Sequence, residues 1–99
     1  MPVYAIAQLT INDRAVYNRY VSRFMPVFSR FKGRVLASDE SPTVVEGKWD
    51  RQKVVLLSFP DEAAYREWAN SPEYQEISRD RHAASSAVIL LAKGFPAPD

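Results

Sequence analysis

The sequence predicts an α+β fold, a single domain in which a four-stranded antiparallel sheet carries its helices on one face. Three observations predict it. Hydrophobic periodicity changes along the chain in the order strand, helix, strand, strand, helix, strand. Residues 54–59 are apolar on both strand faces, as in a central strand covered from both sides. The length of 99 residues, 46% of them hydrophobic, suits one domain, expected over residues 1–94 with a loose tail at 95–99.

The first strand and the first helix are predicted from two different periodicities. Residues 3–11 are apolar on one parity and mixed on the other, which is typical of a strand. Asn12 or Asp13 is a suitable N-cap for the following helix, in which Pro26 predicts a kink and Gly33 is the expected stop. The apolar stripe of this helix recurs at steps of three and four residues and comprises Tyr17, Tyr20, Val21, Phe24, Phe28 and Phe31.

Two β segments are expected before the central strand. Residues 34–39 form the first of them. After the turn residues 40–42, residues 43–49 either continue that strand with a bend or form a strand of their own. The polar residues 50–52 then reverse the chain into the central strand at 54–59.

Capping signals divide the second helical region into two segments. Pro60 stops the central strand, and Asp61 offers an N-cap carboxylate to the first segment. Ser71 as N-cap, with Pro72 in the first helical position, restarts the helix after an interruption. Residues 86–92 are the last strand, apolar on both parities.

The order of these elements is the split β-α-β repeat of ferredoxin-like folds, βαββαβ, whose right-handed crossovers place the helices on one face of the sheet. The other face is then bare. Residues 54–59 and 87–91 would expose an apolar patch there that is too large for a comfortable monomer. We therefore expect a homodimer in which two sheets pack face to face as a dimeric α/β barrel. A ligand would then lie between sheet and helices or inside the barrel.

Composition argues against several classes of function. The chain has no cysteine and one histidine, so thiolate nucleophiles and the common zinc and iron ligand sets are lacking, and no metal or cofactor is expected. A net charge of +1 does not favour nucleic acid, and residues 53–59 lack the glycine and spaced aromatics of an RNA-recognition motif. No apolar run approaches the ~20 residues of a membrane span and no signal peptide is recognisable, so we expect a cytoplasmic protein.

Glu46 and Arg81 are the first candidate site. Tyr74, Ile77 and Arg81 recur at helical spacing, which puts a guanidinium on a stripe that should otherwise face the core. Because Glu46 lies in an expected β segment, the carboxylate and the guanidinium could meet as a bidentate ion pair. Such a pair would anchor a polar ligand group or, as the simpler interpretation, join sheet to helix structurally.

Aromatic side chains form the second candidate site. Trp49, Trp68 and Tyr74, together with Tyr65, could line a ligand pocket, although such residues more often belong to the core. His82 is expected on a different helical face from Arg81. A solvated or capping role for it is simpler than that of a catalytic base, because the sequence supplies no orienting partner.

Several short segments resemble one known family. They are Glu46-Gly47-Lys48-Trp49, Phe59-Pro60, Trp68, Ser71-Pro72-Glu73-Tyr74-Gln75 and Arg81. Over about residues 3–94 the chain resembles the bacterial family catalogued as domain of unknown function 1330, in the dimeric α/β-barrel superfamily. The resemblance implies the fold but not the chemistry. Relatives in the superfamily include cofactor-free quinone-forming monooxygenases, muconolactone isomerases and haem-dependent chlorite dismutases.

Three functional hypotheses follow from the sequence. The first is a homodimer that binds a small, partly aromatic or apolar molecule, with cofactor-free chemistry of the monooxygenase or isomerase kind implied by the resemblance. The second is a non-catalytic binding or stress-related dimer, favoured by the absence of a recognisable nucleophile-base pair. The third is a purely structural interaction module. The sequence does not decide whether the protein is an enzyme.

Overall fold

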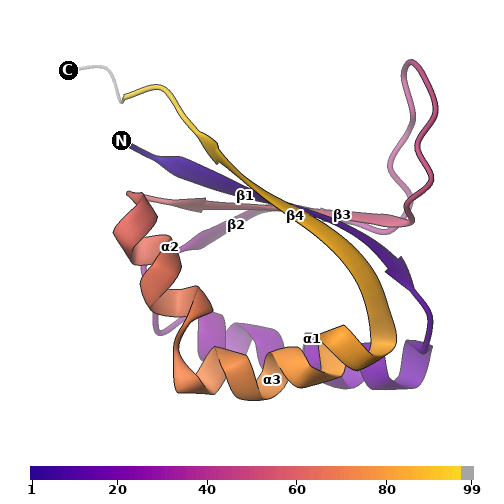
Figure 1. Ribbon diagram of the computed structural model, residues 1–99, viewed down its shortest axis with the longest axis horizontal. Coiled ribbons are helices and arrows are strands. Elements are labelled where there is room, and N and C mark those ends of the chain that lie inside the picture. The colour runs from indigo at the N-terminus through magenta and orange to yellow at the C-terminus, as the bar shows by residue number, and fades with distance from the viewer. Residues whose placement is uncertain (97–99) are drawn as a thin grey trace.

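A computed structural model describes residues 1–96, so the last three residues of the expected tail lie outside the described residues. Figure 1 shows a sheet with all of its helices on one side. The elements in chain order are β1 (Val3–Ile11), α1 (Arg14–Phe28), β2 (Arg34–Asp39), β3 (Lys53–Phe59), α2 (Glu62–Ala69), α3 (Pro72–Ala84) and β4 (Ser85–Lys93). None of the described helices is both long and apolar enough to cross a lipid bilayer.

The four strands form one antiparallel sheet in the order β2-β3-β1-β4. This order places β1 and β3 in the centre and leaves β2 and β4 at the edges. Together with helices on a single face, it is the ferredoxin-like α+β topology expected from the sequence. In one chain the sheet stays open and does not close into a barrel (Figure 1).

All three helices begin at a side chain that accepts a backbone hydrogen bond. The Asp13 carboxylate accepts from the amide of Val16 at 3.2 Å, and the Asp61 carboxylate accepts from the amide of Ala64 at 2.8 Å. Ser71 Oγ accepts from the Tyr74 amide at 3.1 Å, with Pro72 in the first helical turn. Each cap satisfies a donor that has no partner inside the helix, and all three confirm the sequence-based prediction.

The end of α1 differs from the sequence-based prediction. The helix stops at Phe28, five residues before Gly33, and Gly33 does not have a positive φ. The reason for a glycine at position 33 is the lack of room for a side chain. A Cβ atom at position 33 would lie 2.5 Å from the ring of Phe28 and 2.6 Å from the ring of Phe59, both fully buried. Gly33 therefore allows the chain to pass close against two packed aromatic rings.

The predicted β structure at residues 43–49 is wrong. Residues 40–52 form an irregular connection between β2 and β3, which projects from the side of the sheet opposite the helices (Figure 1). Pro42 cannot donate a ladder hydrogen bond, and Gly47 adopts a φ of +88°. A strand also needs a neighbouring strand, and the β2–β3 register ends at the pair Asp39 and Val54.

The core is a layer of aromatic rings between helices and sheet. Phe28 stacks on Phe24 with ring centroids 4.9 Å apart and meets Trp68 edge-on at 5.2 Å. Phe59 on β3 lies 5.9 Å from Phe28 and stacks on Trp68 at 5.6 Å. Rings from α1, α2 and β3 therefore hold the helices against the sheet.

The face of the sheet without helices is apolar, as expected from the two-sided strands. Ile6 pairs with Leu56 of β3 and with Leu90 of β4, so these three side chains lie next to one another on the same face. Leu90 is 52% exposed and Val88 is 41% exposed. We call this surface the open face. In one chain no described helix covers it, and Trp49 of the β2–β3 connection contacts it through Gln8.

Candidate functional site

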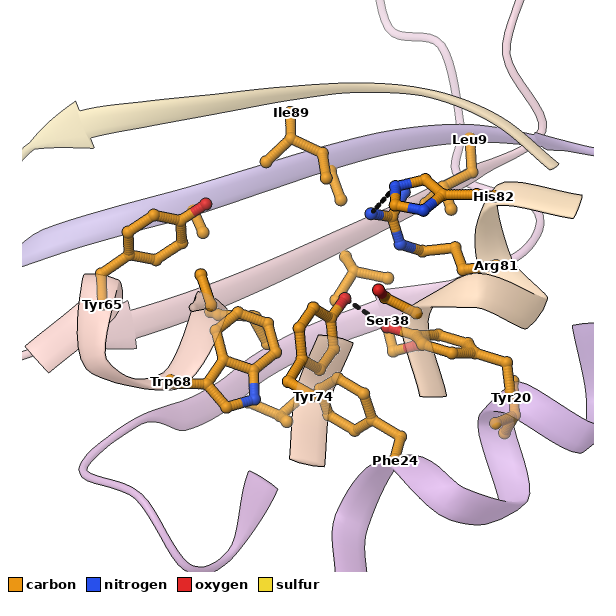
Figure 2. Close-up of a pocket in the computed structure, with 18 of the residues that line it drawn as sticks. Leu9, Tyr20, Phe24, Ser38, Tyr65, Trp68, Tyr74, Arg81, His82 and Ile89 are labelled. Atoms are coloured by element: carbon orange, nitrogen blue, oxygen red, sulfur yellow. Dashed lines mark hydrogen bonds between the residues drawn. The ribbon is translucent and has the colours of Figure 1, made fainter. Parts of the chain in front are cut away.

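A cavity of about 430 Å³ lies between the sheet and the helices. Its floor is made by small and aliphatic side chains of β1 and β3 that point away from the open face, such as Ala7 and Val55. Helices α1, α2 and α3 supply most of the remaining wall, and Ser38 of β2 and Ile89 of β4 also line it (Figure 2). The cavity lies at one of the two places where the sequence predicted a ligand. Its volume is within the range typical of small-molecule sites.

One part of the pocket wall is apolar and aromatic. Figure 2 shows Tyr65 and Trp68 at one end of the pocket and Tyr74 near its middle. Trp68 is only 4% exposed and lies 4.1 Å from the ring of Tyr74. Trp68 and Tyr74 therefore belong to the core and to the pocket wall at the same time, which combines the two interpretations that the sequence left open.

The other end of the pocket carries polar groups. The hydroxyls of Tyr20 on α1 and Tyr74 on α3 form a buried hydrogen bond of 2.9 Å. Burial, reinforced by the neighbouring Tyr74, raises the pKa of Tyr20 well above its usual value of 10.0. Tyr20 therefore remains a neutral phenol at physiological pH and can act only as a hydrogen-bonding group there.

Arg81 and His82 lie at the same polar end (Figure 2). Arg81 Nη2 is 3.1 Å from His82 Nε2, and because a guanidinium has only donors, the imidazole nitrogen must accept. Desolvation, and then the charge of Arg81, lower the pKa of His82 below 6.5. Both residues line the pocket, and their side chains contact each other although they are consecutive on the helix.

The His82 contact makes stability depend on pH. Because the folded-state pKa is lowered, the unfolded chain binds the proton first as the pH falls below 6.5. We expect the melting temperature to fall between about pH 6.5 and 5, while His82→Gln removes that part of the slope. The lowered pKa values of Glu40 and Asp80 act at lower pH, from ordinary values of 4.5 and 3.8. Thermal unfolding at half-unit pH steps checks this, and equal slopes in both proteins would contradict it.

The predicted pair of Glu46 and Arg81 is not formed. Glu46 lies exposed in the β2–β3 connection, and within residues 1–96 no ion pair joins it to Arg81. Trp49 does not line the pocket. Its Nε1 donates to Gln8 Oε1 at 2.9 Å, and Gln8 pairs with Val54 on the open face. Both residues were misplaced because the segment that carries them is not a strand.

Tyr20, Ser38 and Lys53 are among the pocket-lining residues that sequence reasoning did not propose for the site. A signal existed for two of them. Tyr20 was placed on a buried stripe, where a hydroxyl needs a partner. Lys53 shares its strand parity with Val55 and Leu57, so it had to point toward the helices. It is 6% exposed, with Nζ 4.8 Å from the centre of the Tyr17 ring and 4.0 Å from a Glu40 oxygen.

Comparison with family models identifies the chain. The model described as "Domain of unknown function (DUF1330)" matches residues 2–95. The chain belongs to this family. The DUF1330 match covers every helix and strand described above, as the resemblance read from the sequence implied. No curated protein sequence matches the chain.

Solved structures similar to this DUF1330 chain share its ferredoxin-like fold. A protein of unknown function from Rhodopseudomonas palustris is 20% identical, with a TM-score of 0.80 over 97% of this chain and 84% of the other. SnoaB, a cofactor-independent oxygenase from Streptomyces nogalater, is 16% identical, with a TM-score of 0.66 over 97% and 95%. A dimeric ferredoxin-like protein of unknown function from Jannaschia sp. is 16% identical, with a TM-score of 0.69 over 95% and 100%.

Proposed function

We propose that the protein is a homodimer that binds a small, partly aromatic or apolar molecule in the pocket between sheet and helices. The observation that carries the proposal is the cavity of about 430 Å³, with aromatic walls at one end and converging polar groups at the other. Apolar walls supply most of the binding energy of such sites, and a few fixed polar groups orient the ligand.

Cofactor-free chemistry of the oxygenase or isomerase kind is the activity that the polar end supports. Arg81 and the tyrosine hydroxyls are donors suited to negative charge that develops on a carbonyl oxygen. His82, whose pKa is lowered, is neutral at pH 7, and its Nε2 lone pair would serve as a base once the hydrogen bond from Arg81 opens. This chemistry is consistent with the fold, which the chain shares with the cofactor-independent oxygenase SnoaB, and this support is an analogy of fold alone.

A non-catalytic binding protein is the second candidate. His82 has one hydrogen-bond partner among the described residues, the guanidinium of Arg81, and a guanidinium does not orient a histidine as a base. In this case the pocket would hold its ligand without converting it. A turnover assay on any ligand that binds distinguishes the two functions.

The homodimer forms through the open face. Three apolar residues, Ile6, Leu56 and Leu90, lie side by side there with no helix over them. A second copy would cover the patch with its own equivalent patch and form the predicted barrel-like interior between two sheets. Similar structures from Thermobifida fusca and Jannaschia sp. are described as dimeric ferredoxin-like proteins, which agrees with this arrangement.

Thermal unfolding in the presence of candidate ligands tests the pocket. Aromatic acids, quinones and lactones are screened, and a ligand at about 100 times its Kd should add about 2.7 kcal/mol to the free energy of unfolding. Ala7→Leu places a larger side chain on the pocket floor and should abolish the shift, whereas Ala83→Leu on the exposed surface of α3 should leave it unchanged. If a ligand still stabilises Ala7→Leu against thermal unfolding, that ligand binds at a site other than this pocket.

A further inference from the structure

We propose that the ligand of this pocket is an organic monoanion, an aromatic or apolar body that carries one oxyanion, and that Arg81 receives the oxyanion. The inference rests on the proposed function, because it names the chemical class of the molecule that the pocket holds. Charge and hydrogen bonding at the polar end support it independently of each other.

The charged residues of the pocket wall have one sign. Lys53, Arg66 and Arg81 line the cavity, and among residues 1–96 no aspartate or glutamate does. Because three cations line a partly enclosed apolar space, electrostatic attraction stabilises an anion that enters it. The charged side chains of the wall would repel a cationic ligand.

Two of the three cations already have a carboxylate partner. Arg66 Nη2 lies 3.5 Å from Glu62, and its side chain is 59% exposed. Lys53 Nζ lies 4.0 Å from Glu40, whose carboxylate also accepts two hydrogen bonds from Arg14. Arg81 has no carboxylate within 4.0 Å among the described residues. One cation without a partner indicates one negative charge on the ligand.

Hydrogen-bond donors at the polar end outnumber acceptors. Arg81 Nε is buried without a partner among residues 1–96, and one of the two N–H groups of Nη2 donates to His82. Tyr20 and Tyr74 carry two O–H groups and share one hydrogen bond, so one proton of the pair is left for another acceptor. Unpaired buried donors are unfavourable, and a ligand oxygen with several lone pairs would satisfy them.

The donors also lie close together. Arg81 is near enough to Tyr20 for its charge to lower the pKa of that phenol, against the larger effects of burial and Tyr74. Figure 2 shows the guanidinium at the same end of the pocket as the two hydroxyls, away from Tyr65 and Trp68. The oxyanion would lie between guanidinium and phenols, with the apolar body against the aromatic wall.

Calorimetric titration of cinnamate and its neutral isostere cinnamamide at pH 7.5 tests the charge preference. We expect the wild type to bind cinnamate about 10- to 100-fold more tightly than the amide. Arg81→Gln should lower cinnamate affinity by a similar factor and leave that of cinnamamide within about 3-fold. Arg79→Gln is the matched control, because it removes an arginine of the same helix whose side chain is 78% exposed and outside the pocket.

The outcomes separate the two proposals. Equal affinity of the wild type for acid and amide would overturn the inference and leave the small-molecule pocket intact. Binding of neither compound, nor of any ligand in the thermal screen, would overturn the pocket and the inference together. The comparison of acid with amide uses the wild-type protein, so it decides even if Arg81→Gln fails to fold.

Discussion

Replacing Phe28 with alanine is expected to lower the free energy of unfolding by about 3–5 kcal/mol, the typical cost of removing a buried phenylalanine. Phe28 is 1% exposed and contacts Phe24, Phe59 and Trp68. A small domain is stable by about 5–15 kcal/mol, so this single change would remove a large fraction of its stability. The ring also supports two residues of the pocket wall, Phe24 and Trp68, and its loss should weaken ligand binding.

Urea unfolding of Phe28→Ala and Phe95→Ala at the same protein concentration measures the effect. Phe95 is 93% exposed, so the same chemical change there should alter stability by no more than about 0.5 kcal/mol. Equal protein concentration matters because the stability of a dimer depends on it. A cost below about 1 kcal/mol for Phe28→Ala would mean that the aromatic layer is not the core.

Replacing Leu56 with arginine is expected to convert the proposed dimer to a monomer at micromolar concentration. Leu56 is on a central strand, beside Ile6, in the middle of the open face. An unpaired guanidinium buried between two sheets costs several kcal/mol, which would raise the dimer Kd about 100-fold or more. In a monomer the same side chain would be in water.

Sedimentation velocity gives the mass directly. The wild type should sediment with twice the chain mass of 11.3 kDa, and Leu56→Arg should sediment with the mass of one chain. Ala83→Arg adds the same side chain to the exposed surface of α3 and should remain dimeric. Wild-type protein that sediments as a single chain at this concentration would remove the homodimer proposal.

Signals within a few residues of one another predicted most of the fold. Caps at Asp13, Asp61 and Ser71 fix where helices start, because each side chain bonds to an amide three residues away. The two-sided apolar pattern of residues 54–59 predicted a central strand, and it also predicted the apolar open face. These features depend on local chemistry and on strand parity, both of which can be read from sequence.

The candidate site was predicted only in part. Trp68, Tyr74 and Arg81 line the pocket, because each lies on the inward face of its helix, and their role in binding a ligand stays a prediction. Glu46 and Trp49 do not, because they belong to a segment without a strand partner. A local pattern of alternating residues cannot show whether a neighbouring strand is present to pair with it.

The sequence by itself determined the order of the elements, the helix starts, the family and the two-sided sheet. Only the tertiary structure decided that a side chain at position 33 would clash with two aromatic rings. It also decided that Arg81 contacts His82 and that Tyr20 contacts Tyr74. Finally, it placed Arg81, which has no carboxylate partner among the described residues, in the wall of an apolar cavity. The physical reason is distance along the chain. Caps and periodicity act between residues a few positions apart, whereas Tyr20 and Tyr74 are separated by 54 positions and become neighbours only when the helices pack against one sheet.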